Sequence, residues 1–240
     1  MRFRKKLILL YALLALLLSV TLGTVYFQIN NRFYYRNERE NLKANAQQLT
    51  EQMEVRLWQM ESIINYIISD PTILEALVML GSDARSYYNS INIAQLKTTI
   101  RSRIHTNYIM SHAYRTVVFN QYGDAVAANS YALPPGVRAQ GVEEISYLDK
   151  LEQERGKSVL IGPHADRWTT DGWQESVYAL ARAVIGYNTG FVEVSNTVSS
   201  LGTLTVTGNV TEYAILTGDH QILYSSSQAV QELLEKYGGG

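Results

Sequence analysis

The stretch from His164 to Trp173 is the densest group of side chains in the sequence that could recognise a ligand. Arg167 could hold a carboxylate through two parallel hydrogen bonds, and Trp168 or Trp173 could form an apolar wall beside it. Asp166 adjoins Arg167 and belongs to the same candidate site. The alternative is a loop whose tryptophan rings cover a sheet and whose arginine is solvated.

Two further candidates lie on the next apolar segment, which is predicted to form a strand over 177–186. Tyr178 and Arg182 are four residues apart, so they share one face of that strand with Leu180 and Val184. This face could line a pocket, or it could be a sheet face that a helix covers. The complete set of predicted ligand-binding residues is Asp166, Arg167, Trp168, Trp173, Tyr178 and Arg182.

Catalysis, cofactors and metals have little support in the sequence. The nucleophile-elbow, zinc-protease, P-loop and dinucleotide-binding motifs are all missing, so we expect no catalytic residue and no cofactor. The absence of cysteine excludes thiolate catalysis, disulfides and cysteine zinc sites. His164 with Asp166 and Asp171 could in principle hold a metal, but a polar surface loop explains them more simply. We therefore expect no metal.

The net charge of −1 argues against a nucleic-acid partner, because proteins that bind nucleic acids normally carry a basic face. The 240 residues, 46% of them apolar, suffice for one large domain or two modest ones.

The elements that position these residues begin with a membrane anchor. Residues 7–27 carry no charge and no proline, and a helix of this length spans a hydrocarbon core of about 30 Å. Four basic residues precede the segment, and the first acidic residue is Glu38, so the N-terminus is predicted to be cytoplasmic and the main domain extracytoplasmic. A cleaved secretory signal is the alternative, although its apolar core is normally only about 7–15 residues long.

A long helix is predicted to continue from the anchor, because residues 30–70 contain no glycine and the segment lacks proline. Apolar residues recur every three or four positions and form one stripe: Leu42, Ala46, Leu49, Met53, Leu57, Met60, Ile64 and Ile67. The stripe either packs on the chain's own domain or continues out of the membrane as the seam of a homodimer. One helix can do both.

The remainder predicts an α+β fold, since helices come first and antiparallel strands with short turns follow. Short helices are expected over 71–80 and from Ser90, and a polar helix over 142–155. Hairpins are expected over 116–128 and 212–226, with strands over 158–162 and 191–194. The last hairpin and helix either pack on the first domain or open a second domain, and we favour the second account.

The order of these segments resembles a known family. The motifs are the anchor and long helix ending in IISDP, the hairpin VVFNQYGDAVA, the strands VYALARAVIGY and GFVEV, and the hairpin AILTGDHQILYSS. Together they are similar to the double Cache extracytoplasmic region of bacterial sensors, and most of all to YesM-like sensor histidine kinases. The resemblance covers essentially the whole chain.

The resemblance implies PAS-like antiparallel sheet units on a long helix, with the ligand in the membrane-distal unit. The domains expected are a basic cytoplasmic N-terminus (1–6), an anchor (7–27), a long helix (28–70), a membrane-distal Cache unit (71–210) and the start of a truncated membrane-proximal unit (211–240). The expected partners are the membrane, a second copy of the chain, and a small polar extracellular ligand or a ligand-binding protein.

The chain departs from the pattern of the amino-acid-binding members, which carry an Arg-x-Trp arrangement and an aspartate at the end of the later strand. Here Arg167 and Trp168 are adjacent, and the strand end reads Glu193-Val194-Ser195-Asn196. The ligand is therefore expected only to be small and polar. The parent protein is expected to be a histidine kinase. A chemoreceptor, a cyclase regulator and a membrane-anchored protein that binds a partner without signalling are the alternatives.

Overall fold

The computed structural model describes residues 2–81, 90–105, 113–120, 124–128, 145–168, 175–185, 190–205, 212–218 and 220–237. They form two compact units, one within Met1–Thr50 and one made by the described residues from Glu51 onward.

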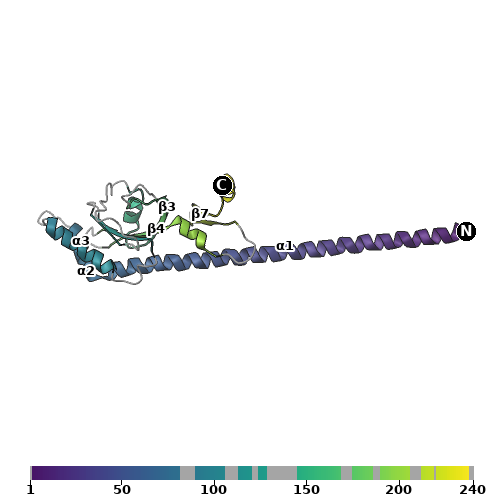
Figure 1. The fold of residues 1–240 in the computed structure, drawn as a ribbon, viewed down its shortest axis with the longest axis horizontal. Coiled ribbons are helices and arrows are strands. Elements are labelled where there is room, and N and C mark those ends of the chain that lie inside the picture. Colours follow the sequence, from purple (N-terminus) through teal and green to yellow (C-terminus); the bar gives the residue numbers. More distant parts are fainter. Residues whose placement is uncertain are drawn as a thin grey trace. The chain divides into compact units, whose positions relative to one another are not determined.

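The first unit consists of the N-terminal part of helix α1, which runs without interruption from Arg2 to Ser69 (Figure 1). It contains the one helix in the described residues that is long and apolar enough to cross a membrane, with a mean hydropathy of 2.4 in its most apolar window and none of that window buried. The hydroxyl groups of Thr21 and Thr24 donate hydrogen bonds to backbone carbonyls one turn earlier in the helix, at 3.0 and 2.7 Å. Their hydroxyls therefore need no water, as a lipid environment requires.

The second unit is built on a five-stranded antiparallel sheet with strand order β2-β1-β5-β4-β3, and the fold class is α+β, as predicted. The register pairs Ala181 with Glu193 in the centre of the sheet. It shifts between Ile161 and His164, where β3 carries a bulge. The strands are β1 (Arg115–Phe119), β2 (Ala125–Ala128), β3 (Val159–Ala165), β4 (Ser176–Ala183) and β5 (Phe191–Thr197).

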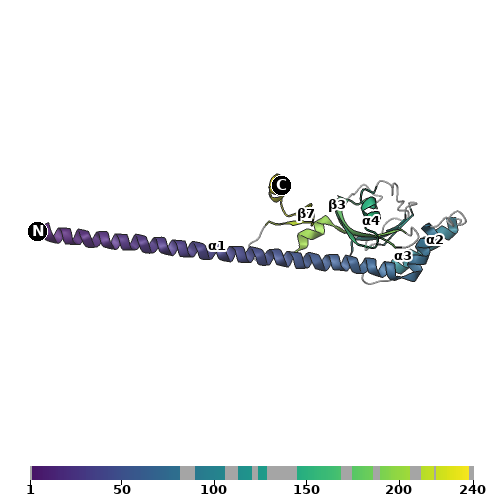
Figure 2. The ribbon, with the colours of Figure 1, turned by 180° about the vertical axis from the view of Figure 1, so that it is seen from behind.

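The two faces of the sheet are covered by different elements, because successive side chains of a strand alternate. One face packs on the part of α1 that follows Glu51, where Met60, Ile64 and Ile67 of the predicted stripe are buried. Helix α4 (Leu148–Gln153) lies over the other face (Figure 2). The hydrophobic core on the α4 face includes Val117, Phe119, Leu151, Val159, Trp168, Ala179, Ala181 and Phe191.

Helix α2 (Pro71–Gly81) begins as the sequence predicts. The Asp70 carboxylate accepts hydrogen bonds from the backbone N–H groups of Thr72 and Ile73 at 2.8 and 3.2 Å, as an N-cap does, and Pro71 occupies the first helical position. Helix α3 (Ser90–His105) follows.

Helix α4 is shorter than the predicted helix over 142–155, of which 142–144 lie outside the described residues. Tyr147 precedes it with ψ of 2° and turns its ring into the core instead of extending the helix. The loop predicted from His164 also begins later, because His164 and Ala165 still belong to β3.

The C-terminal elements are the short helix η4 (Val198–Thr203), the hairpin of β6 (Ala214–Leu216) and β7 (Ile222–Ser225), and helix α5 (Gln228–Tyr237). The hairpin is the predicted one, and Asp219 of its turn lies outside the described residues. Strand β7 packs against β3 and η4. The Tyr213 hydroxyl donates a hydrogen bond to the Leu201 carbonyl at 3.1 Å.

Candidate functional site

Three of the predicted site residues come together where β3 ends. Asp166 and Trp168 are buried, with 1% and 2% of their surface exposed, and Arg167 between them is half-buried. Trp173 lies outside the described residues. The segment 166–168 therefore turns two side chains into the domain and leaves the guanidinium between them at the surface.

A buried ion pair anchors this segment to the sheet. Arg115 Nη1 of β1 lies 2.6 Å from the Asp166 carboxylate, and the two side chains are 3% and 1% exposed. Asp166 also accepts the backbone N–H of Trp168 at 3.1 Å. Because burial removes the hydration of both charges, each charge depends on close contact with the other for its stabilisation. Asp166 thus fixes the position of the segment that carries Arg167 and Trp168.

Glu193, at the centre of β5, forms the floor beneath this segment. Its carboxylate is fully buried and accepts hydrogen bonds from Trp168 Nε1 at 2.9 Å and from the Tyr147 hydroxyl. Burial raises the pKa of Glu193 above its ordinary value of 4.5, although the two hydrogen bonds act in the opposite direction. Both donors are neutral, so the charge has no cation in hydrogen-bond contact among the described residues.

Glu193 was not predicted to be a site residue. A lone glutamate inside the apolar run Phe191–Val194 was the available signal, because an unpaired carboxylate is rarely buried without a specific role.

A cavity of about 400 Å³ opens beside Tyr147 and Arg167. Arg167 lines this cavity and makes no hydrogen bond or ion pair with any described residue. His164 Nδ1 lies 2.8 Å from the Gly162 carbonyl, whereas its Nε2 is buried and has no hydrogen-bond partner among the described residues. The described residues that line this cavity are Ser146, Tyr147, Ile161, Gly162, Pro163, His164, Ala165, Arg167 and Gln221.

The chemistry of the lining favours a small acid. Arg167 can bind a carboxylate with two N–H donors, and the amide of Gln221 can donate or accept a further hydrogen bond. In the described part of the chain, no group of three or more His, Asp or Glu residues could hold a metal ion.

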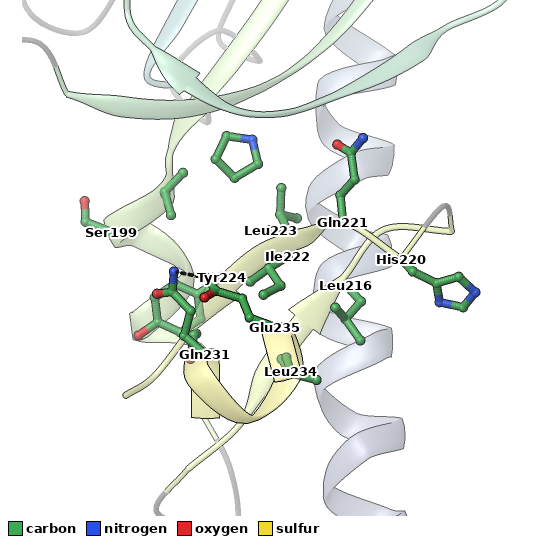
Figure 3. Close-up of a pocket in the computed structure, with 13 residues that line it drawn as sticks. Ser199, Leu216, His220, Gln221, Ile222, Leu223, Tyr224, Gln231, Leu234 and Glu235 are labelled. Atoms are coloured by element: carbon green, nitrogen blue, oxygen red, sulfur yellow. Dashed lines mark hydrogen bonds between the residues drawn. The ribbon is translucent and has the colours of Figure 1, made fainter. Parts of the chain in front are cut away.

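A larger cavity of about 790 Å³ lies next to the first and is mainly apolar (Figure 3). It is formed by the β6–β7 hairpin, α5 and the start of η4, and includes Leu216, Ile222 and Leu234. Pro163 and Gln221 line both cavities.

Tyr178 and Arg182 share one face of β4, as the alternation predicts, but it is the face that packs on α1. Arg182 forms an ion pair with Glu61, donates to Asn65 Oδ1 at 2.9 Å, and contacts Ser158. The Tyr178 hydroxyl is buried and makes no hydrogen bond with any described residue. Burial raises the pKa of Tyr178. The structure therefore puts these two residues on the opposite side of the sheet from Asp166, Trp168 and Glu193.

The comparisons bear on the fold. No protein-family model and no curated protein matches the sequence. Among solved structures, the chain is similar to the ligand-binding domain of the Campylobacter jejuni chemoreceptor Tlp3 in complex with 4-methylisoleucine, with 11% identity, a TM-score of 0.55, and coverage of 81% of this chain and 70% of that chain. The Tlp3 sensory domain with isoleucine bound gives 11% identity, a TM-score of 0.55, and coverage of 85% and 78%.

A second receptor gives a similar result. The ligand-binding domain of the Pseudomonas fluorescens chemoreceptor CtaA in complex with L-serine has 15% identity, a TM-score of 0.50, and coverage of 85% of this chain and 80% of that chain. The chain therefore has the Cache-like fold of chemoreceptor ligand-binding domains.

Proposed function

We propose that the chain is the extracytoplasmic ligand-sensing region of a membrane-anchored signal-transduction protein, and that it has no catalytic role itself. The observation that carries the proposal is the Arg167 guanidinium, which lines a cavity of about 400 Å³ and makes no hydrogen bond or ion pair with any described residue. A cation that no described residue neutralises, held in place by the Arg115–Asp166 ion pair, is an arrangement for binding an anion.

The ligand is a small acid that also carries a hydrogen-bond donor. Arg167 would bind its carboxylate, and Tyr147 and His164 would form the wall of the cavity beside it. Amino acids meet both requirements, and the similar structures of Tlp3 and CtaA contain isoleucine and L-serine. We assign Tyr178 and Arg182 to the contact between α1 and the sheet. Trp173 stays a predicted ligand contact.

The proposed topology has a cytoplasmic basic N-terminus, one membrane span within α1, and the sheet domain outside the cell. The length and hydropathy of the helix and the four basic residues before it support this arrangement. Because the chain has no cysteine, single cysteines at Lys5 and at exposed Gln228 can test it with a membrane-impermeant maleimide in intact cells. Labelling is expected at position 228 only, and labelling at position 5 only would reverse the topology.

For the output we propose a two-component histidine kinase, on the resemblance of the whole element order to YesM-like sensors. A chemoreceptor is the second candidate, because the similar structures are chemoreceptor domains. We also propose that α1 pairs with a second copy of itself. Val55 is 55% exposed on this helix and would contribute to that contact.

Ligand binding is tested by thermal-shift screening of the full chain in detergent against amino acids, hydroxy acids and dicarboxylates. At least one compound is expected to raise the melting temperature. Arg167→Gln should weaken its binding about tenfold or more, because a hydrogen bond to a charged group contributes about 1.5–3 kcal/mol. Arg182→Gln is the matched control, since it removes an arginine from the other face of the sheet. Equal loss of binding in both variants would contradict the assignment of the cavity.

A further inference from the structure

Gln221 connects the C-terminal hairpin to the cavity beside Arg167. It directly precedes β7, and it lines both this cavity and the larger one (Figure 3). A Cβ atom placed on Gly162 would lie 3.1 Å from Gln221 Oε1, so the glutamine side chain lies directly against the β3 bulge. The Gln221 side chain can approach this closely because Gly162 has no side chain.

The backbone of Gln221 is held by hydrogen bonds, whereas its side-chain amide has no partner among the described residues. Its carbonyl accepts the Thr217 N–H at 2.9 Å, and its own N–H donates to Thr217 Oγ1 at 3.0 Å. His220, before it, has a φ of 63° and directs its ring away from the other lining residues (Figure 3). The Gln221 side-chain amide makes no hydrogen bond with any described residue, so both its donor and its acceptor are available.

One peptide unit brings this amide close to the proposed ligand contacts. The Gly162 carbonyl lies 2.8 Å from His164 Nδ1, while the Gly162 Cα faces the Gln221 side chain. Any molecule that reached Arg167 and His164 in this cavity would therefore have the Gln221 amide in the same wall.

We propose that Gln221 is a ligand-contacting residue supplied by the hairpin, and that a bound acid bridges β3 and the β6–β7 hairpin. This inference rests on the proposed function for the kind of ligand, which is an anion. It goes beyond the proposed function because it names the hairpin as the element that contacts the bound ligand. The ligand would restrain the hairpin against the β3 bulge, and α5 follows this hairpin directly.

The cysteine-free sequence allows a test that needs no knowledge of the ligand. Gln221→Cys and His220→Cys are each treated with a negatively charged methanethiosulfonate, which carries ethylsulfonate, and with a positively charged one, which carries ethyltrimethylammonium. The thiolate attacks the sulfenyl sulfur, a mixed disulfide forms, and methanesulfinate leaves. At Gln221→Cys the negative reagent should react about threefold faster than the positive one, relative to free cysteine, because it approaches the Arg167 cation.

Adding Arg167→Gln should remove this preference at position 221 and leave the reaction at position 220 unchanged. The attached sulfonate is also a tethered anion, so it should raise the melting temperature of Gln221→Cys when Arg167 is present and not when it is replaced. A reaction at position 221 that is indifferent to Arg167, or a tethered sulfonate that gives no Arg167-dependent stabilisation, would overturn the inference.

These outcomes are distinct from those of the ligand screen. If a metabolite binds through Arg167 but the reaction at position 221 does not depend on Arg167, the proposed function stands and the role of Gln221 fails. If the thiol responds to Arg167 but no metabolite binds, the shared cavity stands and the proposed function fails.

Discussion

Replacing the buried Glu193 gives a sharp prediction, because this carboxyl group has two neutral donors and no cation in contact with it among the described residues. In Glu193→Gln, the amide oxygen can accept from Trp168 Nε1, and the amide N–H₂ can donate to Tyr147 once that hydroxyl turns from donor to acceptor. The variant keeps both contacts and removes the buried charge. In Glu193→Ala, both buried donors lose their acceptor.

The magnitudes follow from these contacts. Each orphaned buried donor costs about 1–3 kcal/mol, so Glu193→Ala should lower the free energy of unfolding by about 2–6 kcal/mol at pH 4, where the wild-type carboxyl group is protonated when folded. The effect of Glu193→Gln depends on pH. The unfolded side chain loses its proton near the ordinary pKa of 4.5, whereas burial raises the pKa of the folded one. Between these two values the unfolded state binds fewer protons, so the stability of the wild-type chain falls as the pH rises.

Glu193→Gln should therefore become progressively more stable than the wild type as the pH rises above about 4.5, by at most about 1.4 kcal/mol per pH unit, until the folded pKa is passed. Urea unfolding of the full chain in detergent, followed by tryptophan fluorescence from pH 4 to pH 8, measures this difference. Parallel stability curves for Glu193→Gln and wild type, or an unimpaired Glu193→Ala, would refute the reasoning.

Two further predictions concern stability. Asp166→Ala leaves the buried Arg115 charge unpaired and should cost about 3–5 kcal/mol in urea unfolding, whereas the apolar pair Arg115→Met with Asp166→Leu should recover most of the loss; a mild effect of Asp166→Ala alone would contradict this. Gly190→Ala should cost about 1–3 kcal/mol in thermal unfolding, since φ is 135° and the new Cβ would lie 2.5 Å from the Phe119 carbonyl oxygen. Gly218→Ala, with no atom within 4 Å of its Cβ, should change stability by no more than about 0.5 kcal/mol, and equal effects of the two alanines would count against the strain argument.

Much of the fold could be predicted because local patterns agree with it. The Asp70–Pro71 pair marks the start of α2, and the β-branched runs around Val118 and Val192 mark strands. The strand order could not be predicted, since it depends on pairings between distant segments. The sequence predicts a longer α4 because it does not reveal that Tyr147 donates a hydrogen bond to Glu193 in the core, and the helix begins only after this residue.

For the candidate site, local sequence is informative only where the residues are neighbours in the chain. Residues 166–168 are adjacent in sequence, so their composition alone marks them as recognition side chains. Strand alternation predicted that Tyr178 and Arg182 share a face, but it cannot tell which face a helix covers. The Glu61 carboxylate that pairs with Arg182 lies 121 residues earlier in the chain, and no local pattern links the two.

The most direct test of the central claim is the indole N–H signal of Trp168 in the ¹H–¹⁵N spectrum of the full chain, recorded with and without a defined mixture of amino acids and organic acids. Substitution of each of the three tryptophans by phenylalanine assigns the signals, and Trp58 on the exposed side of α1 serves as the internal control. A ligand in the cavity should shift the Trp168 signal and leave that of Trp58 in place, and Arg167→Gln should abolish the shift. A Trp168 signal that stays unchanged in the saturated mixture would contradict the account.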